Sequence, residues 1–170
     1  FEKNPPLALV ANAEIYNDLE LRQKIPIKFE TNSDCEPILF LYDEYGSDFA
    51  KHLRGMYAIA LHDPVRKQLV LSRDPFGIKP LYYCFSEFGF MFASEFQAFL
   101  KVGALKPKVK TQVSEELLQL QFTTGKQTIM EGIYRVMPGE TLIVQDGDIV
   151  ERKIAQGLQP PQIKLSNQND

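Results

Sequence analysis

Hydrophobic residues follow two different periods along this chain. Runs of alternating or continuous apolar residues indicate β-strands, whereas an apolar residue at every third or fourth position indicates an amphipathic helix. The first run, Leu7 to Ala11, is uninterrupted and ends at Asn12, which predicts a buried strand whose C-terminal end delivers polar residues to an edge. Later runs predict three hairpins: Met56 to Leu61 with Gln68 to Leu71, Tyr82 to Phe85 with Phe90 to Ala93, and Thr141 to Val144 with Ile149 to Ile154. We expect the four strands of the first two hairpins to be neighbours.

Helix signals occupy the segments between these strands. Leu19, Leu21 and Ile25 predict a short helix that stops at Pro26, and a brief strand is expected at Ile27 to Phe29. A serine with Glu or Gln three residues later forms a capping box, and a serine followed by glutamates also suits a helix N-terminus. One further helix is predicted from Ser33 to near Gly46. Others are predicted to begin near Phe49, at Ser94 and at Ser114.

Antiparallel hairpins combined with separate blocks of helix predict an α+β fold. A chain of 170 residues, 44% of them hydrophobic, is long enough for one domain with a well-formed core. No periodicity continues beyond Ile154, where Pro160-Pro161 and several glutamines and asparagines follow. We therefore expect one domain over residues 1–154 and a linker or disordered tail over residues 155–170.

Composition and charge exclude several classes of function. A formal net charge of -3 with dispersed lysines and arginines provides no basic field for nucleic acid. No apolar run approaches the roughly 20 residues of a membrane span, and the first residues lack the regions of a signal peptide, so we expect no membrane and a cytoplasmic location. Two cysteines and two histidines, Cys35, Cys84, His52 and His62, form no disulfide framework and no spacing of metal ligands.

Two short polar features are candidates for chemistry, and each has an ordinary structural explanation. Asn12-Ala13-Glu14 stands at the end of a predicted strand, where polar residues commonly just end the pairing. Asp34 stands in the first turn of a predicted helix, where the helix dipole favours an acid. Taken singly, neither feature identifies a site.

Six separated blocks, read in order, change this interpretation. In chain order they are Ala11-Asn12-Ala13-Glu14-Ile15-Tyr16-Asn17, Ser33 to Glu36, Leu53 to Ala58, Arg73-Asp74-Pro75-Phe76-Gly77-Ile78-Lys79-Pro80-Leu81, Phe92 to Glu95 and Pro138-Gly139. The blocks that begin at Ala11 and at Arg73 are the most specific. From about Leu7 to about Ile154, this succession resembles the glutaminase domain of the asparagine synthetase family. Other class II amidotransferases look similar around Arg54-Gly55 but have other residues after the Asn of the first block. Glu14 to Asn17 therefore indicates the asparagine synthetase branch.

The resemblance implies an N-terminal-nucleophile hydrolase fold, a four-layer αββα sandwich with two antiparallel sheets. In that family an N-terminal cysteine attacks the side-chain amide of glutamine, its own α-amine acts as the base, and a thioester forms before water releases glutamate. Carried onto this sequence, Asn12 and the backbone N–H of Ala13 would form the oxyanion hole. Glu14 and Asp34 would hold the α-ammonium of glutamine. The glycine and prolines of the Arg73 to Tyr83 block favour a shaped connector between strands over a direct catalytic role, and Arg73 with Asp74 could form a supporting salt bridge.

This chain departs from the family pattern in two places. Nothing upstream of Leu7 resembles the family's Cys-Gly start or the arginine-containing strand that binds the substrate carboxylate, so we expect a domain that is incomplete at its N-terminus. The missing piece could be truncated, unplaced, on another chain or lost in a degenerate relative. Ala13 also replaces the usual glycine, and its methyl group could restrict φ or crowd the substrate.

The expected function is hydrolysis of glutamine to glutamate and ammonia for an asparagine-synthetase-like amide-forming ligase. The partners implied are glutamine, a synthetase domain or subunit that receives the ammonia, and possibly a second copy of the chain. No cofactor is expected in this domain, since ATP and magnesium belong to the synthetase part, and no phosphate-binding glycine loop is present. The alternative is a non-catalytic domain that keeps the fold for ligand sensing or assembly.

Overall fold

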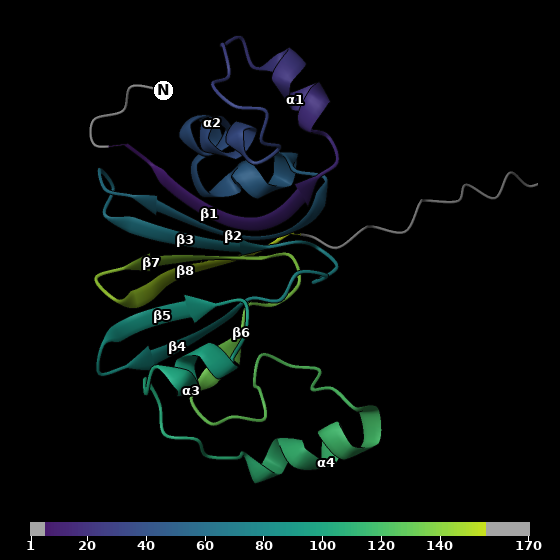
Figure 1. Cartoon of the computed structure of the whole chain (residues 1–170), viewed down its shortest axis with the longest axis vertical. Coiled ribbons are helices and arrows are strands. Elements are labelled where there is room, and N and C mark those ends of the chain that lie inside the picture. Colours follow the sequence, from purple (N-terminus) through teal and green to yellow (C-terminus); the bar gives the residue numbers. More distant parts are fainter. Residues whose placement is uncertain (1–5, 156–170) are drawn as a thin grey trace, which may run out of the picture.

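Two antiparallel sheets stacked between helices form this protein. The computed structural model describes residues 6–155, and its layers follow one another in Figure 1: helices, a larger sheet, a smaller sheet and further helices. The larger sheet has the strand order β1-β2-β3-β7-β8 and the smaller one β5-β4-β6. The bounds of its strands are β1 Ala8–Ile15, β2 Gly55–Asp63, β3 Gln68–Arg73, β7 Glu140–Gln145 and β8 Asp148–Ile154 in the first sheet, and β4 Tyr82–Ser86, β5 Gly89–Ala93 and β6 Ile133–Arg135 in the second.

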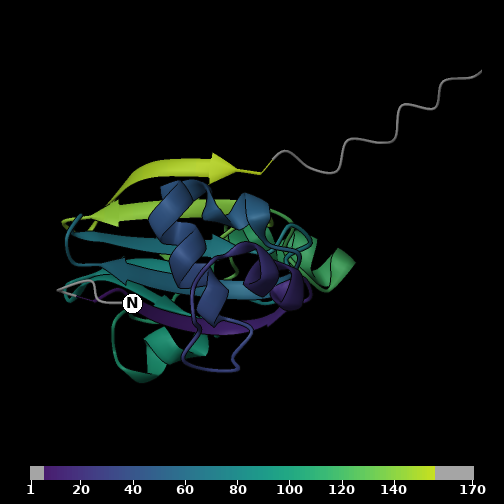
Figure 2. The ribbon, with the colours of Figure 1, turned by 90° about the horizontal axis from the view of Figure 1, so that it is seen from above.

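Helices cover the outer faces of both sheets. Helix α1 (Asp18–Lys24), helix α2 (Glu36–Tyr45) and the 3-10 helix η1 (Gly46–His52) lie over the larger sheet, as the view from above also shows (Figure 2). Helix α3 (Gln97–Lys101) and helix α4 (Thr111–Leu120) lie on the side of the smaller sheet. The α+β sandwich expected from the resemblance is confirmed.

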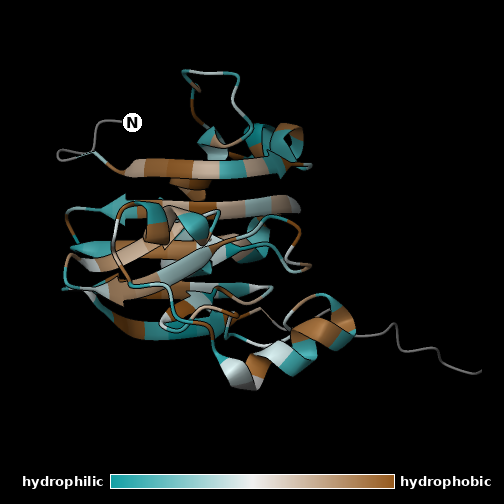
Figure 3. Cartoon of the chain, turned by 60° about the horizontal axis from the view of Figure 1, so that its bottom comes forward, coloured by the Kyte–Doolittle hydropathy of each residue, from teal (hydrophilic) through white to brown (hydrophobic). Residues whose placement is uncertain are grey.

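Strand alternation builds two of the three hydrophobic clusters. In β2, Tyr57, Ile59 and Leu61 face the helices, while Ala58 and Ala60 face the smaller sheet. Successive side chains of a strand point to opposite faces, so one strand supplies both cores. Hydrophobic positions accordingly concentrate in the strands in Figure 3. A third cluster, around Phe99, lies between the smaller sheet and α3.

All three predicted hairpins are present, but the first two do not lie in one sheet. The strands β2 and β3 pair in the larger sheet, whereas β4 and β5 pair in the smaller one. The connector Asp74 to Leu81 carries the chain from one sheet to the other. The hairpins themselves were therefore predicted correctly, but the prediction that their four strands are neighbours was wrong. The short strand β6 has three residues and was not predicted.

Several predicted boundaries differ from the structure for local reasons. No strand forms at residues 27–29. Helix α2 exists and has Gly46, with a φ of 56°, as its C-cap; Ser33 Oγ accepts the backbone N–H of Cys35 at 3.3 Å, but the N-cap residue Cys35 makes no side-chain capping bond. The Glu36 carboxylate instead accepts hydrogen bonds from the backbone N–H groups of Glu30 and Thr31, at 2.7 and 2.8 Å. Ser94 likewise caps no helix, and α4 begins at Thr111 rather than at Ser114. The predicted tail lies outside the described residues, except for residue 155.

Candidate active site at the free edge of strand β1

Strand β1 is the edge strand of the larger sheet, and its pairing determines which backbone groups remain open. Tyr16 donates its backbone N–H to the carbonyl of Arg54 at 2.7 Å, just beyond the last paired residues. In an antiparallel pair, hydrogen-bonded and non-hydrogen-bonded positions alternate. Even-numbered residues of β1 therefore bond to β2, and the N–H groups of Ala13 and Ile15 point to the free edge of the sheet.

The sequence predicted an apolar strand over Leu7 to Ala11 with Asn12-Ala13-Glu14 at its end, and the structure extends it. The strand continues to Ile15, with Leu9, Ala11 and Ala13 packed against the helix-side core. Asn12 and Glu14 consequently lie within the strand, on its opposite face. The uninterrupted apolar sequence at the start of the strand concealed this alternation.

Asn12 lines a cavity of about 260 Å³ between the two sheets. The cavity is bounded by the β1 and β2 positions Val10, Ala11, Asn12, Ala58 and Ala60, and across from them by Leu81, Phe92, Ala93 and Ser94. The described residues provide the Asn12 carboxamide with no hydrogen-bond partner. An exposed carboxamide without a partner, in a mainly apolar hollow, is available to a ligand.

Asp34 reaches the same strand from the segment that precedes α2. Its Oδ2 accepts a hydrogen bond from the backbone N–H of Ile15 at 2.7 Å. Its Oδ1 accepts a bond from the Cys35 thiol at 3.6 Å. Burial and then the neighbouring Asp34 carboxylate raise the pKa of the Cys35 thiol to about 11, so this thiol stays protonated at neutral pH.

Glu14 faces a lysine from the connector between β3 and β4. The Lys79 Nζ lies 3.7 Å from Glu14 Oε1, and the side chains are 21% and 59% exposed. Gly55 allows β2 to approach at this point, because a Cβ there would lie 2.2 Å from the Glu14 carbonyl oxygen. The Glu14 carboxylate therefore remains open to solvent while its backbone is held tightly.

The connector is organised by Asp74, whose side chain is fully buried. Its carboxylate accepts backbone N–H bonds from Tyr57, Phe76, Ile78 and Lys79 at 3.0 to 3.3 Å. The structure thus confirms that this block shapes a connector. It corrects the expected salt bridge, because Asp74 binds backbone N–H groups instead of Arg73.

Arg73 also stabilises the connector, by binding backbone carbonyl groups. Its guanidinium donates to the carbonyls of Gly77, Lys79 and Val136 at 2.7 to 2.8 Å. Gly77 has a φ of +63°, and an added Cβ would lie 2.8 Å from Pro138 Cγ. The turn therefore requires glycine both for its backbone conformation and for space.

Comparisons with known proteins establish the family of this chain. A family model described as a glutamine amidotransferase domain matches residues 1–154. This chain belongs to that family. The amidotransferase domain is 36% identical over 145 residues to an amidase of Gibberella zeae, covering 84% of this chain and 21% of the relative. It is 35% identical over 145 residues to asparagine synthetase [glutamine-hydrolyzing] 1 of Bacillus subtilis, covering 83% of this chain and 23% of the relative.

Solved structures support the fold of the amidotransferase domain. A glutamine phosphoribosylpyrophosphate amidotransferase from B. subtilis, complexed with ADP and GMP, matches with a TM-score of 0.63 at 24% identity over 87% of this chain and 29% of the other. A structure described as the allosteric regulatory enzyme of purine biosynthesis matches with a TM-score of 0.64. At this level of identity the likeness concerns the fold.

Ala13 fits the amidotransferase fold without backbone strain. It is not among the non-glycine residues with positive φ, and it lies in the extended strand β1. Its methyl group packs against the helix-side core, away from the cavity that Asn12 lines. The methyl group therefore neither forces an unusual φ nor enters that cavity, and the backbone N–H at the free edge is retained.

Three of the four predicted site residues lie in β1, and the fourth, Asp34, reaches this strand from the segment before α2. Asn12 and Glu14 share the face toward the smaller sheet, the Ala13 N–H points to the free edge, and Asp34 binds that edge at Ile15. Sequence reasoning did not single out Lys79 or Ser94. Lys79 belonged to a block interpreted as structural, and Ser94 was assigned to a helix cap.

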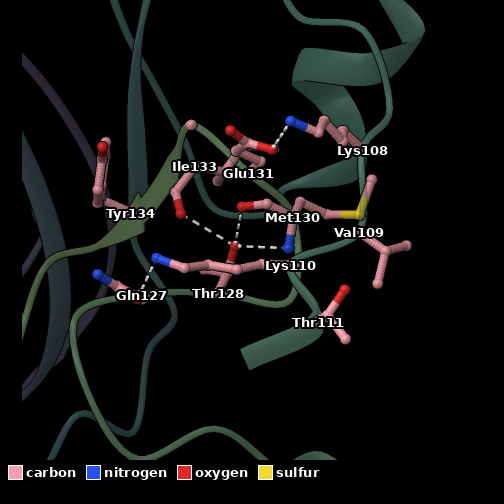
Figure 4. Close-up of a pocket in the computed structure, with 11 residues that line it drawn as sticks. Lys108, Val109, Lys110, Thr111, Gln127, Thr128, Met130, Glu131, Ile133 and Tyr134 are labelled. Carbon is pink, nitrogen blue, oxygen red and sulfur yellow. Dashed lines mark hydrogen bonds and ion pairs between the residues drawn. The ribbon is translucent and has the colours of Figure 1, made fainter. Parts of the chain in front are cut away.

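A larger hollow in the amidotransferase domain, of about 500 Å³, lies near α4 and β6 (Figure 4). Its polar groups are bound to one another: Lys108 pairs with Glu131 at 2.7 Å, and the Thr128 hydroxyl donates to the Ile133 carbonyl at 2.9 Å. Lys110 donates to Gln127 across it.

No group of three or more His, Cys, Asp or Glu side chains in residues 6–155 could hold a metal ion. Among those residues, no helix combines the length and the apolar character of a membrane span.

Proposed function

We propose that this amidotransferase domain hydrolyses the side-chain amide of glutamine to glutamate and ammonia and supplies the ammonia to an ATP-dependent, amide-forming ligase. The observation that carries the proposal is the arrangement at β1. The unpartnered Asn12 carboxamide, on the face of β1 toward the smaller sheet, and the Ala13 N–H, at the free edge of the same strand, are donors from consecutive residues. Two donors held by a paired strand suit the oxyanion of a tetrahedral intermediate, where one such donor contributes about 3 kcal/mol.

Substrate recognition is assigned to Glu14 and Asp34. The Glu14 carboxylate is 59% exposed and can receive an α-ammonium group without burying an unpaired charge. Asp34 already accepts one backbone N–H, and a carboxylate has further lone pairs for a second donor. Glu14 directly follows Ala13 and Asp34 binds the strand at Ile15, so an amino acid held by the two acids would have its side-chain amide close to the oxyanion donors.

The nucleophile of this reaction is not supplied by Cys35 or Cys84. Burial raises the pKa of the Cys84 thiol, and burial with Asp34 raises that of Cys35 to about 11, whereas nucleophilic cysteines need a lowered thiol pKa. The resemblance implies an N-terminal cysteine whose α-amine serves as base. The proposal therefore requires that a cysteine from outside residues 6–155 reach the free edge of β1.

The names of the relatives support the proposal of a ligase partner. The chain spans 21 to 23% of the length of four curated relatives that it matches, which include asparagine synthetases described as glutamine-hydrolyzing. We place the binding of ATP and magnesium in such a partner domain or subunit. The amide acceptor would be bound there as well.

The proposal is tested with the full-length natural protein and glutamine labelled with ¹⁵N in its side-chain amide. We expect stoichiometric release of glutamate and labelled ammonium, and, once ATP and the acceptor are present, transfer of the label into a new amide. Binding of glutamine without any release of glutamate would contradict the proposal and favour the alternative of a ligand-sensing domain.

A further inference from the structure

A cavity of about 360 Å³ opens on the helix-covered side of the larger sheet, at the end of β8. It is lined by η1, by β7, by the end of β8 and by Tyr57 of β2, and we call it the Tyr57 cavity. Tyr57 pairs with Ala13 and belongs to the helix-side core, whereas Asn12 faces the smaller sheet. The larger sheet therefore lies between the Tyr57 cavity and the cavity that Asn12 lines.

The Tyr57 hydroxyl differs from those of the other two tyrosines that are equally buried. Tyr42 donates to Asp63 at 3.2 Å, and Tyr83 accepts from Arg152 at 2.9 Å. Tyr57 is 2% exposed, and the described residues provide its hydroxyl with no partner. No completely enclosed side-chain oxygen or nitrogen among those residues lacks a partner, so the Tyr57 hydroxyl must open into the cavity. A buried hydroxyl without a partner destabilises the fold, and a ligand oxygen that bonds it would remove this penalty.

The Tyr57 hydroxyl is a hydrogen-bond donor at neutral pH. Burial, followed by the neighbouring negative charge of Asp74, raises the pKa of Tyr57 to about 12. The hydroxyl therefore keeps its proton and suits an acceptor oxygen of a ligand.

Two lysines share one carboxylate at the rim of the Tyr57 cavity. The Nζ atoms of Lys51 and Lys153 each lie 3.1 Å from the same Asp48 Oδ1. Lys153 also donates to Ser47 Oγ at 2.7 Å and lies 3.7 Å from Glu151, which does not line the cavity. Among the lining residues two positive charges thus face one negative charge, so an anion is attracted there.

We propose that the Tyr57 cavity binds a small organic carboxylate. Its oxygen accepts the Tyr57 hydroxyl, and its charge is met by Lys51 and Lys153. The Tyr57 ring, Ala50 and Ile154 offer apolar surface to the rest of the ligand. The volume falls within the range of pockets that hold small molecules. A phosphate ester also presents anionic oxygens, so the test includes one.

The test uses the full-length natural protein with three ring compounds: benzoate, the uncharged benzamide and phenyl phosphate. Binding is measured by calorimetry. We expect benzoate to bind about 10-fold or more tightly than benzamide, and Tyr57→Phe to weaken benzoate binding about 10-fold. Lys153→Met should weaken benzoate binding and leave benzamide binding unchanged, which tests the site without altering Tyr57. Tyr134→Phe, in the smaller sheet and outside the cavity, is the matched control.

Urea unfolding gives a second readout. Because the Tyr57 hydroxyl has no partner without ligand, the midpoint of Tyr57→Phe should equal or exceed that of the wild type. Benzoate should raise the midpoint of the wild type and not that of Tyr57→Phe. A midpoint of Tyr57→Phe clearly below the wild type would show that the hydroxyl is already bonded and would overturn the inference.

The remaining outcomes decide the site and the class of ligand. No saturation by benzoate up to about 10 mM, or benzoate binding that Tyr57→Phe leaves unchanged, would overturn the inference. Tighter binding of phenyl phosphate than of benzoate, lost in Tyr57→Phe, would assign the cavity to phosphate esters and refute the carboxylate. None of these results depends on glutamate release, so they stand apart from the test of the proposed function.

Discussion

The Asp34 carboxylate accepts the backbone N–H of Ile15 at 2.7 Å, and this contact joins the start of α2 to the free edge of β1. The edge of a sheet normally exposes such N–H groups to solvent or to another strand. Here the Ile15 N–H is bound by Asp34, which is also a candidate residue for binding the substrate. Asp34 therefore acts in the fold as well as in the proposed site, and substitutions can separate the two roles.

Replacing Asp34 by asparagine or alanine should affect stability and binding differently. Asparagine keeps an acceptor oxygen for the Ile15 N–H, so we expect Asp34→Asn to stay within about 1 kcal/mol of the wild type in urea unfolding. Alanine removes the acceptor and should cost about 1 to 3 kcal/mol. Both variants should bind glutamine at least 10-fold more weakly in calorimetry, because both lose the negative charge. Glutamine binding by Asp34→Asn that equals the wild type would show that the carboxylate does not hold the substrate.

The buried Asp74 gives a prediction about stability. Its carboxylate serves four backbone N–H groups, and Asp74→Ala leaves these donors without their acceptor. We expect a loss of about 3 to 5 kcal/mol in the free energy of unfolding, measured by urea titration. Asp148→Ala, at an exposed position in β8, should change it by less than about 0.5 kcal/mol. Equal unfolding midpoints for the two variants would contradict the assigned role of Asp74.

These contacts also show which parts of the molecule the sequence could predict. The three hairpins and helix α2 follow from local periodicity, and the structure confirms them. The division of the first two hairpins between sheets depends on the connector, whose conformation arises from hydrogen bonds of Arg73 and Asp74 to distant backbone. No local pattern encodes those partners.

The same distinction holds for the candidate site. Motif resemblance identified Asn12, Ala13, Glu14 and Asp34, but it could not place them on the faces and the edge of one strand. The apolar sequence from Leu7 to Ala11 supported a strand without indicating which of its faces is buried. The ion pair between Lys79 and Glu14 could not be predicted from the sequence, because the two residues are far apart along the chain.

Ala13 supplies a direct test of whether the missing glycine limits activity. Its methyl group packs against the helix-side core and its φ is not positive. We therefore expect Ala13→Gly to lower stability by about 0.5 to 1 kcal/mol and to leave the rate of glutamate release within 2-fold. Glutamate release and urea unfolding are measured on the same sample. A rise in rate of 10-fold or more would show that the methyl group obstructs the reaction.

Cys35 should be a slow thiol. Its pKa of about 11 lies about two units above the ordinary value of 9.0, which at pH 8 leaves about 100-fold less thiolate. Since the thiolate is the reactive form, iodoacetamide should modify Cys35 at least 10-fold more slowly than free cysteine at pH 8. The rate should rise as the pH increases from 9 to 11, as followed by peptide mass spectrometry. Rapid alkylation at pH 8 would contradict the assigned environment.

The central claim is that Asn12 stabilises the oxyanion of glutamine hydrolysis, and the most direct measurement is the kcat/KM of glutamate release by the full-length natural protein and its Asn12→Ala variant. The account predicts a decrease of about 100-fold or more with unchanged unfolding, while Asn32→Ala, at an exposed asparagine outside the site, retains wild-type kinetics. Glutamate release that persists at the wild-type rate in Asn12→Ala would contradict the account.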